Sequence, residues 1–542
     1  MCESCIYNSS ASLPPFPTGG DMLDFLVQLG EISKPDGLLA TWVHGANDKE
    51  DMNKALASDV MILESDITLE GYGTSNEKPI PIMAHPPDIF SDNTLDQWLD
   101  AVLASRKCMK LDFKALESVG LSLDLLSQKN SSRGINRPVW VNADIVLGPN
   151  LQSPFPIING TRFLQLIHEK FPDVTLSPGW KVLYVPQIFT KTYTRPMMEE
   201  MYNMIKDAPQ KVTFPIYTVL APRGWQHINW LLTQSSRFSL TLWQDSIRPK
   251  VDDLLFIRDN THPAAVYYDI YEPTLSEFKQ ALGVQGRLRR FYPGGDLMDF
   301  LYPIHNSDTN FPSTVTPRNS LAVRWFTVTD WASLLTQLSD GAAGMLVVRV
   351  ASDISQPGVP LVEGSSKSSE ALTLQDILHL LGQRAEVPWG VHLRIYTQQL
   401  LEASLKLLHS AYSRDELFRP VWISMEGLQS INDTEEFVSA VERVFPYVTL
   451  VLTEQKWPPV IPATVAGLSQ RVALHLNTAS LPKGEEVLNS LLEMMDRYDL
   501  IMEEDAKSSA GALSLFKTLL TQRTGRTNTN LYVISDQSVI SN

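Results

Sequence analysis

The sequence predicts an α/β fold built as two tandem (β/α)8 barrels of the TIM type, the second a degenerate copy of the first. Its 542 residues, 44% of them hydrophobic, suit two globular domains of similar size, and about 250 residues is the usual length of such a barrel. Several segments of the first half recur in the second half. Short apolar runs also alternate with helical segments. These three observations together predict the fold.

The recurring segments are the strongest evidence for an internal duplication, since they keep both their order and their spacing. The matching pairs are 19–26 with 294–301, 94–97 with 373–376, 137–141 with 419–423, and 171–176 with 445–450. The second pair starts with a threonine that is typical of a helix N-cap. We therefore expect an N-terminal tail over 1–18, a first domain over 19–290 and a second domain over 291–542.

The first half contains eight short apolar runs, each a candidate strand. They are 39–43, 60–63, 109–113, 139–141, 174–176, 212–215, 240–243 and 265–268. Runs that are apolar on both faces and separated by helical segments indicate parallel strands beneath a helical shell, and eight of them can close into a barrel. An open doubly wound sheet is the alternative. It would carry a glycine-rich phosphate loop after the first strand, and the segment 42–47 is not one.

Charge and composition limit the partners. The net charge of −16 would repel nucleic acid and anionic lipid over most of the surface, so we expect no nucleic-acid partner and only local recognition of phosphate. Three cysteines exclude a disulfide scaffold. Neither a signal peptide nor a run of about 20 apolar residues is visible. On these grounds alone the compartment stays open, the cytoplasm included.

Polar residues cluster where the first strands end. In chain order they are His44, Asn47, Glu64, Asp66, His85, Asp112, Lys114, Asn142 and Asp144. The carboxyl ends of barrel strands share one rim, which is where such folds hold their active sites. Burying ionisable groups without partners costs several kcal/mol, so these groups should face a shared cavity, a metal ion or one another.

Metal-assisted attack on a phosphodiester is the chemistry that suits this set. Glu64, Asp66 and Asp112 offer hard oxygen ligands for a divalent cation, Mg²⁺ or Ca²⁺. His44 and His85 could divide the proton transfers, and Lys114 would add positive charge near the phosphate.

The remaining candidates would contact the substrate. They are Asn47, Asn142, Asp144 and Trp180. Asn142 and Asp144 could instead pair with Lys114 inside the barrel, and Trp180 could simply pack.

The His44, Glu64-Ser65-Asp66 and His85 pattern resembles that of glycerophosphodiester phosphodiesterases and related phospholipase-like barrels. Further segments resemble the menorin family, and the two-domain layout resembles its two-domain members; these segments are 41–47, 82–87, 110–114, 141–144 and 176–180. The resemblance implies a phosphodiesterase-type barrel whose activity is not established. It also implies a phosphodiester or lipid head-group ligand, cell-surface protein partners, and an extracellular or membrane-attached glycoprotein.

This chain departs from the phosphodiesterase pattern at three positions. Gly45 follows the first histidine where that family has arginine, Pro86 follows the second where it has aspartate, and Asp112 replaces a glutamate. Metal ligation could survive these changes, but substrate choice need not. A non-catalytic interaction protein with a vestigial site is therefore the rival hypothesis.

The second half serves as an internal control because its copy of the site is missing. Alignment of the two halves places other residues opposite the candidates: Phe326 for His44, Thr329 for Asn47, Val348 for Glu64, Val350 for Asp66, Gly364 for His85 and Arg394 for Asp112. We therefore expect a second barrel that keeps its packing but lacks the site.

Overall fold

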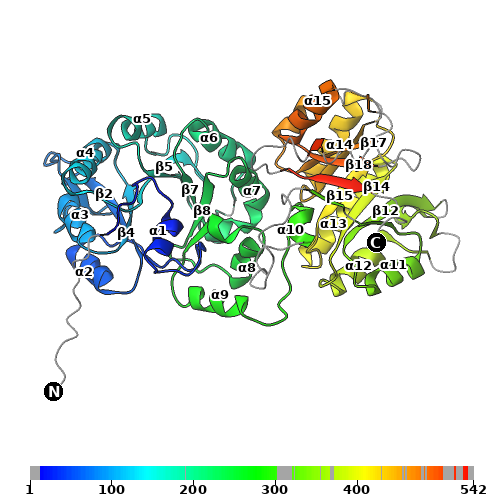
Figure 1. Cartoon of the computed structure of the whole chain (residues 1–542), viewed down its shortest axis with the longest axis horizontal. Helices are drawn as coiled ribbons and strands as arrows, with labels where there is room; N and C mark the ends of the chain where they lie inside the picture. Colours follow the sequence, from blue (N-terminus) through cyan, green and yellow to red (C-terminus); the bar gives the residue numbers. More distant parts are fainter. Residues whose placement is uncertain are drawn as a thin grey trace, which may run out of the picture. The chain divides into compact units, whose positions relative to one another are not determined.

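The computed structural model divides the chain into two compact units, Met1–Gly283 and Val284–Asn542. The boundary predicted after residue 290 lies slightly further along the chain. The residues that the structure describes are 13–189, 191–301, 320–322, 324–353, 356–365, 371–428, 430–454, 457, 461–477, 481–482, 485–503, 518–519 and 529–534. Most of the predicted tail, residues 1–12, lies outside them. Figure 1 follows the chain through both units by colour.

The first unit is a (β/α)8 barrel. Its parallel strands, in sheet order, are β1 (Trp42–Val43), β2 (Ile62–Leu69), β4 (Cys108–Phe113), β5 (Val139–Leu147), β6 (Thr175–Lys181), β7 (Val212–Tyr217), β8 (Phe238–Trp243) and β9 (Val266–Asp269). The short β3 (Pro81–Met83) pairs antiparallel with β2. All eight predicted strands are confirmed, and the apolar run at 81–84 is this extra strand.

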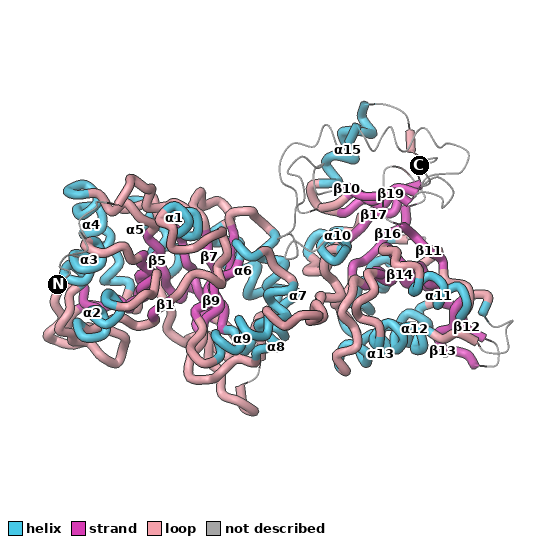
Figure 2. Tube along the Cα trace, turned by 60° about the horizontal axis from the view of Figure 1, so that its bottom comes forward, coloured by secondary structure: helices cyan, strands magenta, loops and turns pink. Residues whose placement is uncertain are grey.

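Helices alternate with these strands and surround them (Figure 2). They are α1 (Met22–Gln28), α2 (Lys49–Ala57), α3 (Leu95–Leu103), α4 (Leu116–Arg133), α5 (Gly160–Lys170), α6 (Arg195–Ile205), α7 (Trp225–Thr233), α8 (Val251–Asp259) and α9 (Thr274–Leu282). Thr94 caps α3 in a capping box with Gln97, as the sequence predicts. Helix α1 covers the amino end of the barrel, where its buried face packs on Trp140 and Tyr267.

The second unit repeats this architecture. Its strands, in sheet order, are β10 (Ser320–Ala322), β19 (Leu531–Ile534), β18 (Asp499–Glu503), β17 (Val472–Asn477), β16 (Thr449–Glu454), β15 (Val421–Met425), β14 (Trp389–Ile395), β12 (Gly344–Asp353) and β11 (Arg324–Thr327). Only residue 323 separates β10 from β11, so the two ends of the sheet lie on one stretch of chain and the barrel closes. An antiparallel strand, β13 (Gln356–Val362), pairs with β12 as β3 does with β2.

The described helices of the second unit also follow the first. They are α10 (Leu297–Leu301), α11 (Trp331–Ser339), α12 (Leu374–Gln383), α13 (Gln398–Ser413), α14 (Ile431–Val444) and α15 (Glu485–Met495). Leu297 of α10 packs with Trp422 and Tyr532, in the way that α1 packs on Trp140 and Tyr267. The structure thus confirms two tandem barrels.

Candidate metal and acid–base site

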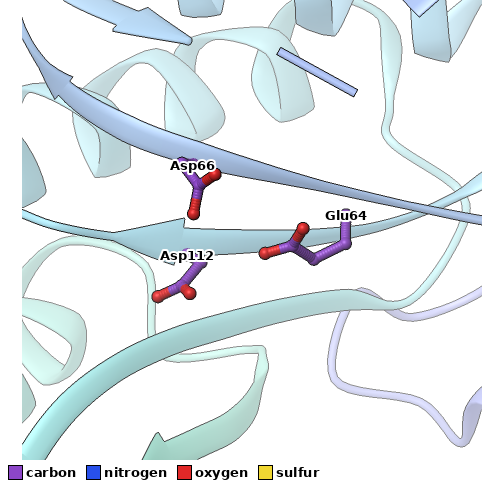
Figure 3. A group of neighbouring side chains, drawn as sticks. All are labelled: Glu64, Asp66 and Asp112. Atoms are coloured by element: carbon purple, nitrogen blue, oxygen red, sulfur yellow. The ribbon is translucent and has the colours of Figure 1, made fainter. Parts of the chain in front are cut away.

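Three carboxylates meet inside the first barrel near the carboxyl ends of β2 and β4. Glu64, Asp66 and Asp112 each offer an oxygen, and these oxygens lie within 4.8 Å of one another. Asp66 and Asp112 are paired across the two strands. Glu64 shares their face because it lies two residues before Asp66 on β2. Figure 3 shows the resulting group.

Two asparagines fix the orientation of the aspartates. Asn47 Nδ2 donates to Asp66 Oδ2 at 3.0 Å, while its Oδ1 accepts from the backbone N–H of Asp66 at 2.8 Å. Asn142 Nδ2 donates to Asp112 Oδ1 at 3.1 Å, and its Oδ1 accepts from Ser177 Oγ at 3.0 Å. Each amide is thus engaged with a carboxylate neighbour. Asn47 and Asn142 therefore hold the carboxylates of Asp66 and Asp112 in place, and their contact with a substrate stays a prediction.

Lys114 joins the two aspartates. Its Nζ lies 2.5 Å from Asp112 Oδ2 and 3.0 Å from Asp66 Oδ1. Burial alone would lower the pKa of Lys114, but the two carboxylates outweigh it and hold that pKa well above its usual value. The ammonium therefore stays charged and neutralises part of the acidic cluster.

His44 is held by an aspartate from the opposite end of the sheet. Its Nδ1 lies 2.8 Å from Asp269 Oδ2, at the end of β9, and 3.7 Å from Glu64 Oε2. Two carboxylates beside one ring nitrogen favour a proton on Nδ1, which leaves Nε2 for proton transfer. Gly45 follows with φ +70°, and its N–H donates to Glu64 Oε2 at 2.8 Å. That backbone conformation suits glycine.

The acidic surroundings set the charge of His44 and Asp66. The charge of Glu64, followed by the contact with Asp269, raises the pKa of His44 to about 9, so at neutral pH the ring is an imidazolium. Burial pushes the pKa of Asp66 up, but Lys114 and Asn47 outweigh it and the pKa is lowered.

Burial and like charge act together on two other carboxyls of the cluster. Burial, with the charge of Asp66, raises the pKa of Glu64. Burial also raises the pKa of Asp144, with the charge of Asp112 adding to it. Both shifts favour the protonated form of these two carboxyls unless a cation lies beside them.

Two other predicted residues, His85 and Asp144, lie outside the group of three carboxylates. His85 is exposed and its Nδ1 contacts Pro86 O at 2.6 Å, although its charge still helps to lower the pKa of Asp66. Asp144 lies at the edge, with its Oδ2 3.9 Å from Lys181 Nζ.

Trp180 lies outside the cluster. It is buried, its Nε1 donates to Met197 O in α6 at 3.2 Å, and it packs against Tyr193 and Phe214. Gly179, its neighbour on β6, is the residue beside Asp144. Because side chains alternate along a strand, Trp180 must face the helices. It is a packing residue between sheet and shell.

Sequence reasoning missed Asp269 and Lys110. Asp269 is the first polar residue after the predicted strand 265–268, so the strand-end criterion that selected Glu64 and Asp66 would have found it. Lys110 lies inside an apolar run on β4, is 3% exposed, and is paired in the sheet with Glu64. Its charge acts on His44, Glu64 and Asp144. The available signal was the spacing within the predicted strand 109–113, because Lys110 lies two residues before Asp112 and therefore shares its face.

The donor set fits a divalent cation. Glu64 Oε1 is buried and has no hydrogen-bond partner within the described parts of the chain, and an orphaned buried carboxylate oxygen calls for a cation or water. Carboxylate oxygens suit Mg²⁺ and Ca²⁺. Glu64, Asp66 and Asp112 would hold the ion, and Lys114 would then have to release at least one of its two aspartates.

The second barrel has no such cluster at the corresponding positions. Trp422 pairs in the sheet with His392 as Trp140 pairs with Lys110. His392 pairs in turn with Val347, as Lys110 pairs with Glu64. Val347 therefore corresponds to Glu64.

The alignment of the two halves by sequence was wrong by one residue along the first two strands. Arg349, not Val350, corresponds to Asp66, and Val347, not Val348, corresponds to Glu64. By the same register Thr327, not Phe326, corresponds to His44.

A difference in loop length explains the shift at His44, whereas the shift at Glu64 and Asp66 runs in the opposite direction along the chain. One residue fewer separates the strand tryptophan from the helix-capping aspartate in the second barrel, Trp325 to Asp330, than in the first, Trp42 to Asp48. A constant offset therefore cannot align both elements.

The second barrel has replaced acidic residues with ion-paired arginine. Arg394, opposite Asp112, donates from Nε to Glu426 Oε1 at 2.6 Å. Ile534 ends β19 where Asp269 ends β9. The loss of the site from the second copy holds with the corrected register.

Fold and site together define a class: tandem TIM-type barrels in which one member has an acidic centre beside a histidine–aspartate pair. The sequence profile described as the Menorin N-terminal domain matches residues 36–275 and again 319–533. These two matches cover most of the chain, one in each barrel. The chain belongs to the Menorin N-terminal domain family.

A human relative and a bacterial structure were also found. Protein FAM151B from Homo sapiens is 41% identical over 269 residues, which is 49% of this chain and 95% of that protein. A solved structure from Silicibacter pomeroyi, assigned as a glycerophosphoryl diester phosphodiesterase, aligns at 10% identity with a TM-score of 0.27. It covers 39% of this chain and 90% of its own. So low a score carries no argument about this chain.

Among the described residues, no helix combines the length and the apolar character that crossing a membrane requires.

Proposed function

We propose that the first barrel binds a divalent cation, Mg²⁺ or Ca²⁺, together with a phosphodiester-like anion, and acts as a metal-dependent phosphodiesterase. The observation that carries the proposal is the convergence of Glu64, Asp66 and Asp112 within 4.8 Å, beside a histidine whose ring is fixed by Asp269 at 2.8 Å. Membership of the menorin family does not name a substrate.

Each residue has a distinct part in this proposal. The cation, when bound, would neutralise charge on a phosphoryl oxygen. His44 is held as an imidazolium by Asp269 and Glu64, so it is suited to donate a proton from Nε2 to the leaving oxygen. His85, at the exposed edge, is the candidate base for the attacking nucleophile. Lys114 would supply positive charge to the anion once it leaves an aspartate.

The test uses the full chain with Mg²⁺ and Ca²⁺ in turn and glycerophosphocholine as the probe, because its leaving alkoxide must take up a proton. We expect slow metal-dependent hydrolysis to a phosphomonoester and a free alcohol, at a rate that falls at least about 100-fold in His44→Gln, the usual size of an acid–base contribution. Asp269→Asn should lower the rate less, because it loosens the ring without removing it. Equal rates in wild type and His44→Gln, with both folded, would end the enzyme proposal.

One observation favours a second candidate, a non-catalytic interaction protein of the cell surface. Lys114 already bridges Asp66 and Asp112, so the acidic group has an internal cation and could persist as a polar core. In that case neither metal would raise the melting temperature. Lys114→Met would then lower stability, since it leaves two buried carboxylates without their counterion.

We also propose an extracellular or membrane-attached location with cell-surface protein partners, in keeping with the family resemblance. Asn159 begins a glycosylation sequon and its side chain is exposed at the start of α5. N-glycans are added to such sequons in the secretory pathway. Mass spectrometry of the protein from its own cells should find glycan at one or more of its sequons, and unmodified sequons throughout would contradict this location.

A further inference from the structure

The connection between β6 and α6 contains a small hairpin with apolar side chains turned to solvent. Val185 and Phe189 form an antiparallel bridge, and Val185 O accepts from the N–H of Phe189 at 2.9 Å and of Ile188 at 3.2 Å. Gln187 at the tip has φ +67°. Ile188 is 70% exposed and Phe189 40%. The turn is hydrogen-bonded, so this exposure belongs to an ordered backbone.

The base of the hairpin is fixed to the neighbouring β5–α5 connection by Asn150. Its Nδ2 donates to Leu183 O at 2.7 Å and to Phe189 O at 3.2 Å, and its Oδ1 accepts from Lys191 N at 3.0 Å. Leu183 N also donates to Pro149 O at 3.3 Å. One side chain thus holds both ends of the hairpin, and the apolar tip cannot easily fold back to cover itself.

Further exposed apolar side chains lie on the same two connections. Val185 and Leu183 are each 37% exposed, and Phe155 and Ile157 of the β5–α5 connection are 44% and 38% exposed. Isolated apolar residues at a surface are ordinary, but a group of them on adjoining loops indicates an interaction site. We call residues 183–189 with Phe155 and Ile157 the apolar rim.

The apolar rim adjoins the candidate site. Lys181, the last residue of β6, has its Nζ 3.9 Å from Asp144 Oδ2, and Asp144 lies close enough to Asp112 for their charges to interact. Both connections follow the carboxyl ends of neighbouring strands. A surface that engages the rim would therefore lie beside the acidic centre.

Size and charge favour a lipid surface as the occupant over a folded protein. A stable protein interface needs about 800 Å² from each partner, which a narrow hairpin tip does not supply. A bilayer interface accepts a few apolar side chains, particularly beside lysines that reach the phosphates. Lys181, which is half-buried, and Lys191, which is exposed, flank the hairpin, in a chain whose net charge is −16.

We propose that the apolar rim inserts into the interfacial layer of a membrane, with Lys181 and Lys191 on lipid phosphates. This docking does not depend on metal binding or turnover. The further claim that phospholipid in the bilayer is the substrate presented to the acidic site does rest on the proposed function.

The test is co-sedimentation of the full chain with phosphatidylcholine vesicles, with and without phosphatidylserine. Ile188→Ser with Phe189→Ser should weaken partitioning roughly tenfold or more, since each side chain loses its burial in the interface. Lys191→Gln should lower it about fivefold on the anionic vesicles only, the factor for one lysine near an anionic surface.

Val185→Ser and Val27→Ser form the matched control. Both valines are 37% exposed, but Val27 lies on α1 at the amino end of the barrel. Binding should fall for the first and not for the second, with unchanged melting temperatures in both. If the wild type binds neither kind of vesicle, docking is overturned. An equal loss of binding in the two valine variants overturns it as well. Docking without metal-dependent turnover would leave the membrane inference standing and remove only the enzyme.

Discussion

The amino ends of the two barrels agree closely, whereas their carboxyl ends do not. At the amino ends a cluster of two tryptophans and a tyrosine recurs, as Trp42, Trp140 and Tyr267 in one barrel and Trp325, Trp422 and Tyr532 in the other. At the carboxyl ends, among the residues that the structure describes, the acidic cluster occurs in the first barrel and not in the second. In TIM barrels the amino face serves stability and the carboxyl face serves chemistry. The duplication has therefore kept the part that folds the domain.

An ion pair at the amino end shows the same agreement. Asp21 caps α1 and its Oδ2 lies 3.2 Å from Lys211 Nζ. Asp296, at the start of α10, lies 3.1 Å from Arg471 Nη2. Lysine in one copy is arginine in the other, but the contact survives. The comparison predicts that variants at the amino ends affect both barrels alike, and variants at the carboxyl ends only one.

The largest effect is expected from a buried arginine that both barrels share. Arg137 donates to the carbonyl oxygens of residues 102, 103, 107 and 135, and Arg419 to those of 381, 384, 387 and 389. Arg137→Met and Arg419→Met should each destabilise their own barrel by about 3 kcal/mol or more, because several buried carbonyls lose their donor. Urea denaturation of both variants measures this. A large loss of stability in one barrel only would show that the two arginines do not have the same structural role.

Metal binding is expected to give the second-largest difference in stability between the two barrels. Mg²⁺ or Ca²⁺ at about 100 times its dissociation constant should stabilise the first barrel by about 2.7 kcal/mol and leave the second unchanged. Asp112→Asn should abolish the shift. Arg394→Gln, at the equivalent position of the second barrel, is the control and should not alter it. Calorimetry with and without the metal gives the answer, and a shift that survives Asp112→Asn would exclude the proposed ligands.

A buried ion pair should make the first barrel acid-sensitive. Arg258 donates to both oxygens of Asp36, at 2.7 and 2.6 Å. Burial alone would raise the pKa of Asp36, but Arg258 outweighs it and the pKa is lowered. The stabilisation is therefore complete above the unfolded value of about 3.9 and is lost as pH falls through the lower folded value. Asp36→Asn keeps one acceptor oxygen for Arg258 and should cost about 2 kcal/mol at neutral pH, the size of a hydrogen bond to a charged group.

The pH dependence of that difference is the check. Wild type and Asp36→Asn should converge in unfolding free energy as the solution is acidified below pH of about 4. A difference that stays constant down to acid pH would mean that the side chain stabilises the barrel by shape and not by charge.

The smallest effect is expected at two matching helix caps. Thr94 caps α3 with Gln97, and Thr373 caps α12 with Asp376, each in a capping box. Thr94→Ala and Thr373→Ala should each cost about 1 kcal/mol. Thermal unfolding of the two variants compares the caps directly, and clearly unequal losses would show that the two helices depend on different neighbours.

The sequence was sufficient for the fold because packing leaves periodic signals. Each strand of the first barrel is a run of apolar residues, and the repeated segments mark structural positions such as Arg137 and Trp140. It was also sufficient to bring Glu64, Asp66 and Asp112 together, since neighbouring parallel strands end at one edge. The boundaries of 19–290 and 291–542 stay predictions.

The sequence was not sufficient for contacts that close the barrel or cross its wall. Asp269 meets His44 because the last strand returns beside the first; the sequence pattern marks the end of strand 265–268 but does not say which side chain meets the histidine. Trp180 and Gly179 differ by one position on β6, and the pleat sends one outward and the other inward. The register between the copies slipped at His44 because a loop shortened by one residue moved the strand tryptophan relative to the helix cap.

The contact between His44 and Asp269 joins two residues from the two ends of the first barrel's sequence. The histidine is made early and its partner more than two hundred residues later, at a sequence separation of 225. Asp269 belongs to β9, which pairs with β8 and brings Tyr267 into the core cluster at the amino end of the barrel. A chain that ended before β9 would therefore lose the anchor of the imidazole together with part of the core, so the position of the His44 ring depends on completion of the first barrel.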